Sequence, residues 1–78
     1  MLVMEHPSIR SGRVRELRIE NHLTQQELAV MADLSLGQVN RIEGGKIERP
    51  QFRTVRALAH ALGVEVDELL SSNLNGSS

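Results

Sequence analysis

The sequence predicts an all-α fold in which two short helices meet at a tight corner, and three observations agree on this. Helix-start signals of the Ser/Thr-x-x-Glu/Gln type begin at Thr24 and again at Ser35. Apolar residues recur at helical spacing through most of the chain. The 78 residues include one Phe and neither Trp nor Tyr, so they suit one small domain with an aliphatic core.

The composition limits the cell compartment and the kinds of metal or disulfide site that the protein can have. The chain contains no Cys, which excludes disulfides and thiolate metal sites and is compatible with the cytoplasm. No apolar run approaches the roughly 20 residues of a membrane span, and residues 1–9 lack the apolar core of a signal peptide. We therefore expect a cytoplasmic protein with no membrane partner and no cofactor.

The net charge of −1 is low for a nucleic-acid binder, but the charges are unevenly placed. All nine basic residues lie between Arg10 and Arg56, and only acids follow Arg56. Such a distribution allows a local positive face that could hold phosphates. The alternative is that the basic residues simply solvate helix surfaces.

The first segment, residues 1–11, is expected to be a flexible N-terminal arm, since Pro7 discourages helix just before it. Ser8 or Ser11 could cap the first helix, which should run to about Asn21. Val14 and Leu17 lie three residues apart in this helix and should face the core.

The second and third helices should form a helix-turn-helix. Thr24 can form a capping box with Glu27, and Ser35 can form one with Gln38. Asp33 at the corner is one of the few residue types other than glycine that tolerate a positive φ. Helical spacing turns five apolar residues inward: Leu28, Ala29, Ala32, Val39 and Ile42. The two alanines are small enough to let the helix axes cross closely.

The remaining elements close the bundle. The third helix should end at Gly44-Gly45 after residues 35–43. A fourth helix over residues 52–62 should bury Val55, Leu58, Ala59 and Leu62, and Gly63 should end it. A short fifth helix is expected over residues 67–72, and residues 71–78 read as a frayed polar tail. This leaves residues 12–70 as the folded domain.

The order of these motifs resembles the Cro and phage-repressor (XRE) family of DNA-binding domains. The resemblance rests on TQQELA, Leu34-Ser35 after the corner, VNRIEGGK, Pro50 and ALAHALGVEVDELL. It implies a compact five-helix bundle, the repressor-like DNA-binding domain, whose third helix enters the DNA major groove, commonly as a dimer. It also implies a partly buried ion pair between Arg18 and Glu43, although two unrelated surface charges are the alternative.

Two positions depart from the family's usual pattern. His22 stands where Gly commonly closes the first helix, and Asp33 stands where Gly commonly makes the corner. Both residue types can adopt left-handed backbone geometry at some cost in stability.

The proposed DNA face has a distinct chemical capacity at each position. Arg41 can donate two hydrogen bonds to guanine, and Asn40 or Gln38 could bridge the N6 and N7 atoms of adenine. Leu36 suits a thymine methyl group. Gly37 could let the backbone approach the groove, unless it is simply tolerated in the first turn. The expected base-contacting residues are thus Leu36, Gly37, Gln38, Asn40 and Arg41.

Phosphate contacts should surround this helix, at helix N-termini and in the loop before Pro50. The expected residues are Thr24, Gln25, Ser35, Lys46, Arg49, Gln51 and Phe52.

The resemblance, together with the side chains of the proposed DNA face, therefore implies a sequence-specific regulator that binds double-stranded DNA, most simply a repressor acting as a homodimer on a palindromic operator. The alternative is a DNA-binding antitoxin or adaptor whose main partner is a protein, such as a toxin or the transcription machinery. Ile19, Val30 and Met31 are expected on the surface and could form such a contact. Neither an enzyme nor a metal site is expected, because the three His residues are far apart in the chain.

Overall fold

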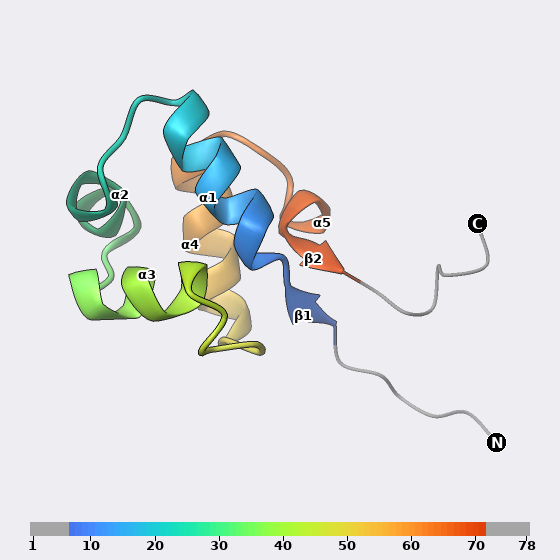
Figure 1. The fold of residues 1–78 in the computed structure, drawn as a ribbon. Coiled ribbons are helices and arrows are strands. Elements are labelled where there is room, and N and C mark those ends of the chain that lie inside the picture. Colours follow the sequence, from blue (N-terminus) through green and yellow to red (C-terminus); the bar gives the residue numbers. More distant parts are fainter. Residues whose placement is uncertain (1–6, 72–78) are drawn as a thin grey trace, which may run out of the picture.

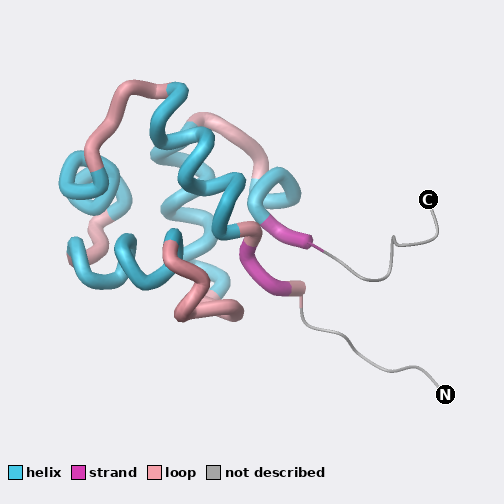
Figure 2. The backbone as a smooth tube through the Cα atoms, viewed as in Figure 1, coloured by secondary structure: helices cyan, strands magenta, loops and turns pink. Residues whose placement is uncertain are grey.

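The computed structural model describes residues 7–71, in which five helices are accompanied by two very short strands (Figure 1). In chain order the elements are β1 (Ser8–Ile9), α1 (Ser11–Glu20), α2 (Gln25–Ala32), α3 (Leu36–Glu43), α4 (Phe52–Leu62), α5 (Val66–Leu69) and β2 (Leu70–Ser71). Helix α4 packs against α1, α2 and α5, while α3 packs against α1 and α2. The helix-turn-helix therefore lies at one end of the molecule and the strand pair at the other (Figure 2).

Both predicted capping boxes are present and begin α2 and α3. The Thr24 hydroxyl accepts from the Glu27 amide at 3.0 Å, and the Glu27 carboxylate accepts from the Thr24 amide at 2.8 Å. At Ser35 the corresponding distances to Gln38 are 3.0 and 3.1 Å. Between the helices, Asp33 takes the left-handed conformation with φ of 58°. These local signals set the steep crossing of α2 and α3.

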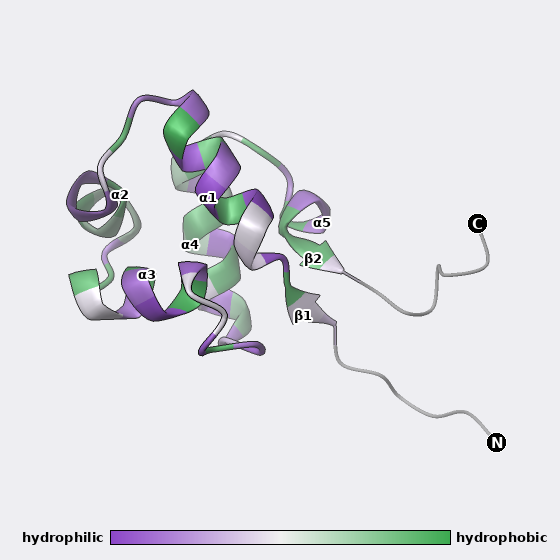
Figure 3. Cartoon of the chain, in the orientation of Figure 1, coloured by the Kyte–Doolittle hydropathy of each residue, from purple (hydrophilic) through white to green (hydrophobic). Residues whose placement is uncertain are grey.

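The core is aliphatic, as predicted, and is shared by all five helices. Hydrophobic and hydrophilic bands follow one another along the helices (Figure 3), and the residues at helical spacing within the hydrophobic bands are the buried ones. Every residue that helical spacing turned inward in α1 to α4 is buried, and Leu69 of α5 joins them. The buried set is Ile9, Val14, Leu17, Leu28, Ala29, Ala32, Val39, Ile42, Val55, Leu58, Ala59, Leu62 and Leu69.

The start of the chain differs from the sequence prediction. Ser8 and Ile9 form a strand that pairs antiparallel with Leu70 and Ser71. Ile9 is only 6% exposed, and its amide donates to the Glu48 carbonyl at 2.8 Å. The folded part therefore begins before residue 12, and it includes Ser71, for which the sequence predicts a place in the tail. The rest of the predicted arm and tail, residues 1–6 and 72–78, lies outside the described residues.

Two helix ends also differ from the prediction. Neither serine caps α1, because the N-cap is Arg10, which makes no side-chain capping bond. Helix α5 ends at Leu69, three residues early, because Leu70 turns to extended geometry with φ of −110° and enters β2. By contrast, α4 has its predicted bounds and ends at Gly63 with φ of 73°. His22 also has the expected positive φ, 59°.

An ion pair connects α1 to α5 on the surface. Arg13 Nη2 lies 2.6 Å from Glu68 Oε2, and Arg13 also pairs with Glu16 in its own helix. The hydrogen bond to Glu68, and to a lesser extent the one to Glu16, raises the pKa of the Arg13 guanidinium, because each carboxylate favours its charged form. Among residues 7–71, no helix is long and apolar enough to cross a membrane.

Candidate nucleic-acid interface

Helix α3 is anchored on one side and open on the other. Val39 and Ile42 are each 1% exposed, since they pack into the core. The opposite side of the same helix presents Leu36, which is 45% exposed, together with Asn40 and Arg41. The structure thus turns three of the five predicted base-contacting residues toward solvent, while Gly37 and Gln38 are half-buried.

Gly37 and Arg41 lie one above the other on this open side. A Cβ atom added at Gly37 would lie 3.4 Å from Arg41 Nη1, so the guanidinium extends over the glycine. This direction is the ordinary one, because side chains on a helix lean toward its N-terminus. Within residues 7–71, Arg41 forms no ion pair that would occupy its donors.

The ion pair implied by the family resemblance is confirmed. Arg18 Nε donates to Glu43 Oε2 at 2.7 Å, and Arg18 Nη2 donates to Glu43 Oε1 at 3.1 Å. The side chains are only 13% and 3% exposed, respectively. Arg18 Nη1 also donates to the Leu23 carbonyl at 2.9 Å. The pair therefore fixes the end of α3 against α1 and against the loop between α1 and α2.

Two hydrogen bonds extend this pair to the open side of α3. Gln25 Nε2 donates to Glu43 Oε1 at 3.0 Å, and Asn40 Nδ2 donates to Gln25 Oε1 at 3.4 Å. The sequence predicts only a phosphate contact for Gln25, so this link was not anticipated. No pattern in the sequence signals it, because the three residues come from different turns of two helices.

Gln38 has less freedom than the sequence suggested. Its Oε1 atom accepts from the Ser35 amide in the capping box, and its side chain lines a groove with Gln51 and Thr54 of the α4 start. An amide that bridges adenine must accept with its oxygen and donate with its nitrogen. Because the Gln38 oxygen is already engaged, Asn40 is the better placed of the two amides for that contact.

The predicted phosphate-contacting residues lie around α3, on the start of α2, on the start of α3 itself and on the loop that leads to α4 (Figure 1). Gln25 is half-buried, whereas the other six are exposed: Thr24, Ser35, Lys46, Arg49, Gln51 and Phe52. The first amides of a helix have no partner within it, so the starts of α2 and α4 offer N–H donors to an anion.

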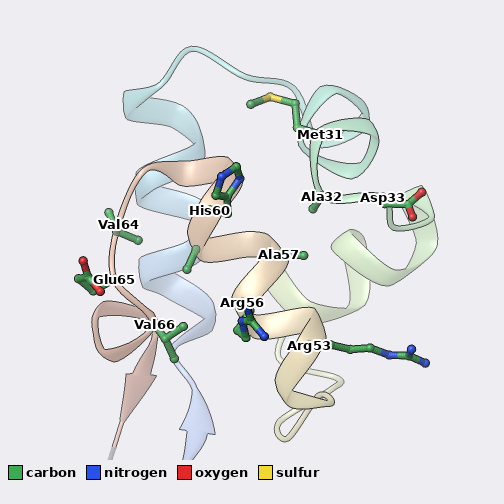
Figure 4. A pocket seen from close by; sticks show the side chains of 11 residues that line it. Met31, Ala32, Asp33, Arg53, Arg56, Ala57, His60, Val64, Glu65 and Val66 are labelled. Carbon is green, nitrogen blue, oxygen red and sulfur yellow. The ribbon is translucent and has the colours of Figure 1, made fainter.

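A second hollow lies away from α3, between the end of α2 and the middle of α4. Figure 4 shows its lining, with Met31 and His60 on the upper part and Arg56 and Val66 below. Its charges nearly balance, because Arg53 and Arg56 lie with Asp33 and Glu65. In the described part of the chain, no three His, Cys, Asp or Glu side chains come together as a metal site would require.

Comparison with known proteins agrees with this geometry. A family profile described as helix-turn-helix matches residues 14–69. HigA2 of Mycobacterium tuberculosis, which carries the name of an antitoxin, is 41% identical over 59 residues, or 76% of this chain and 58% of HigA2. The matched part spans between 43% and 58% of the length of the curated relatives.

Solved structures show the same arrangement of helices. The restriction-modification controller protein C.AhdI from Aeromonas hydrophila has a TM-score of 0.71 and 33% identity, covering 74% of this chain and 86% of that one. The P22 c2 repressor, solved in complex with a synthetic operator, has a TM-score of 0.75 and 25% identity, covering 81% and 94%. The chain therefore belongs to the helix-turn-helix family of Cro and phage-repressor domains.

Proposed function

We propose that this protein is a transcriptional regulator that recognises a specific sequence of double-stranded DNA by placing α3 in the major groove. The observation that carries the proposal is the two-sided nature of α3, in which Val39 and Ile42 seat the helix while Leu36, Asn40 and Arg41 face solvent. The likeness to the P22 c2 repressor, solved with an operator, supports it.

The open side of α3 offers a separate contact at each position. Arg41 can donate two hydrogen bonds to guanine O6 and N7, and Asn40 can pair with adenine. Leu36 can contact a thymine methyl group. Gly37 keeps its turn free of a side chain beneath the Arg41 guanidinium, so the backbone can approach the groove closely. Gln38, at the margin, keeps only its N–H donors free.

Phosphates would be held on both sides of α3. Thr24, Ser35 and the backbone amide of Gln25 lie at the starts of α2 and α3, where the helix dipole and free amides favour an anion; the Gln25 side chain is held by Glu43 and Asn40. On the other side lie Lys46 and Arg49 in the loop, followed by Gln51 and Phe52 at the start of α4. These contacts set the position of the protein on the duplex and carry no sequence information.

We further propose that the protein acts in the cytoplasm as a repressor and as a homodimer on a palindromic operator. One recognition helix reads only a few base pairs, which is rarely sufficient against genomic competition. A surface for the second copy is available beside the α3–α4 loop, where Phe52 is 61% exposed. Pro50, Val55 and Leu70 line an apolar hollow next to it.

The proposal is tested by selecting bound sequences from random duplex DNA with the full chain. The expected result is a palindrome with half-sites about one helical turn apart. The variant Arg41→Ala should lose its preference at one base pair in each half-site, by ~1–3 kcal/mol. Arg15→Ala is the matched control, because Arg15 is exposed on α1 and its loss changes the net charge equally. Selection of no sequence by the wild-type protein would refute the proposal.

A second candidate function is that of an antitoxin or adaptor that acts mainly through a protein partner. It is favoured by the likeness to HigA2 and by three exposed apolar residues, Ile19, Val30 and Met31. Under this function, substitution of these residues by Ser should abolish partner binding and leave DNA binding intact. Catalysis is not proposed, since His22 and His60 are exposed on separate elements and His6 lies outside the described residues.

A further inference from the structure

The carboxylate of Glu43 fixes the direction of a chain of hydrogen bonds. A carboxylate can only accept hydrogen bonds. Glu43 is 3% exposed and accepts twice from Arg18 and once from Gln25. The Gln25 side chain must therefore turn its NH₂ group toward Glu43, since the opposite orientation would place two acceptor oxygens together.

The orientation of Gln25 then determines that of Asn40. With its NH₂ group on Glu43, Gln25 presents its oxygen to α3, where Asn40 Nδ2 donates to it at 3.4 Å. This bond is long, but the reversed Asn40 amide would bring two oxygens into contact. Asn40 therefore directs its oxygen and its second N–H away from Gln25, and Asn40 is exposed.

From this arrangement we infer that Gln25 is a positioning residue that sets base preference through Asn40 without touching a base itself. The oxygen and the free N–H of Asn40 match the N6 donor and the N7 acceptor of adenine. The buried Arg18–Glu43 pair keeps this amide pre-oriented, so less side-chain freedom is lost on binding. The base-reading half of the inference rests on the proposed function, whereas the orientation of Asn40 does not.

A phosphate contact from Gln25 would have a different consequence. Loss of a phosphate contact weakens binding to all sequences alike, because the backbone carries no sequence information. Loss of a positioning residue instead reduces discrimination at one base pair. The base pair in question is the one at which Asn40→Ala removes the preference.

The main test measures binding of Gln25→Met, which keeps the side-chain length but has no amide. The control is Gln26→Met, because Gln26 is the next residue of α2 and is exposed. Each variant is titrated with the selected operator and with its three single-base alternatives at the Asn40 position. Discrimination by Gln25→Met should fall about tenfold, and a second substitution of Asn40 by Ala should reduce it no further. Equal weakening on all four duplexes, or a match to Gln26→Met, would overturn the inference.

A second measurement needs no DNA. Relaxation of the Asn40 side-chain ¹⁵N amide should show an ordered group in the wild-type protein and in Gln26→Met, but a mobile group in Gln25→Met and Gln25→Ala. Unchanged order in both Gln25 variants would overturn the positioning role. If the wild-type protein selected no DNA sequence, the proposed function and the base-reading half would both fail. The relaxation data would still decide the positioning half.

Discussion

The buried pair of Arg18 and Glu43 allows a quantitative prediction about stability. In Arg18→Met, the Glu43 carboxylate loses two of its three donors, and the Leu23 carbonyl loses one. Because the Glu43 side chain is 3% exposed, water cannot replace them fully. A charge stranded in this way costs about 3–5 kcal/mol. A domain of this size has roughly 4–12 kcal/mol of stability in total, so the loss should be a large share of it.

The reverse variant and the double variant sharpen this test. Glu43→Met should cost less than Arg18→Met, because the Arg18 side chain is 13% exposed and can reach water more easily. Arg18→Met combined with Glu43→Met removes both charges and should be more stable than Arg18→Met alone. Urea unfolding followed by circular dichroism gives all three free energies. A loss of less than about 1 kcal/mol in Arg18→Met, which is the contribution expected of an exposed ion pair, would refute a buried charge pair. So would a double variant whose loss of stability equals the sum of the losses in the two single variants.

Three further predictions concern the corner and the DNA face. Asp33→Gly should raise the free energy of unfolding by about 0.5–1 kcal/mol, and Asp33→Val should lower it, because φ at residue 33 is 58°. Equal melting temperatures for the wild-type protein and both variants would contradict this prediction. Gly37→Ala should stabilise α3 by up to about 1 kcal/mol. It should also weaken operator binding, because the added Cβ atom would lie 3.4 Å from Arg41 Nη1. Unchanged affinity in a gel shift would count against close approach of the backbone at Gly37. Lys46→Ala and Arg49→Ala should each weaken binding to all DNA sequences alike, and each should lower by about one the slope of the binding constant against salt concentration on logarithmic axes. A loss of affinity that depends on one base pair would contradict the phosphate role.

The sequence predicted those parts of the fold that depend on neighbouring residues. The capping boxes at Thr24 and Ser35, the corner at Asp33 and the inward positions of α4 all follow from spacings of three or four residues. The Arg18–Glu43 pair connects distant residues, and it was anticipated only through the family resemblance.

The features that were missed all depend on contacts between distant parts of the chain. Strands β1 and β2 have two residues each, too few for any periodic pattern, and each exists because the other lies beside it. The cap of α1 at Arg10 is governed by the same pairing, since its amide donates to the Leu69 carbonyl. The Gln25 link to Asn40 requires the packed arrangement of α2 on α3, which no local spacing encodes.

The most direct test of the central claim is to map the amide signals of the ¹⁵N-labelled full chain during titration with the selected operator. The largest changes should fall on α3, especially at Leu36, Asn40 and Arg41, and at the starts of α2 and α4. A scrambled duplex should reproduce the changes at the helix starts but not those of Arg41. Changes confined to the hollow around Met31 and His60, with α3 unaffected, would contradict a reading role for α3.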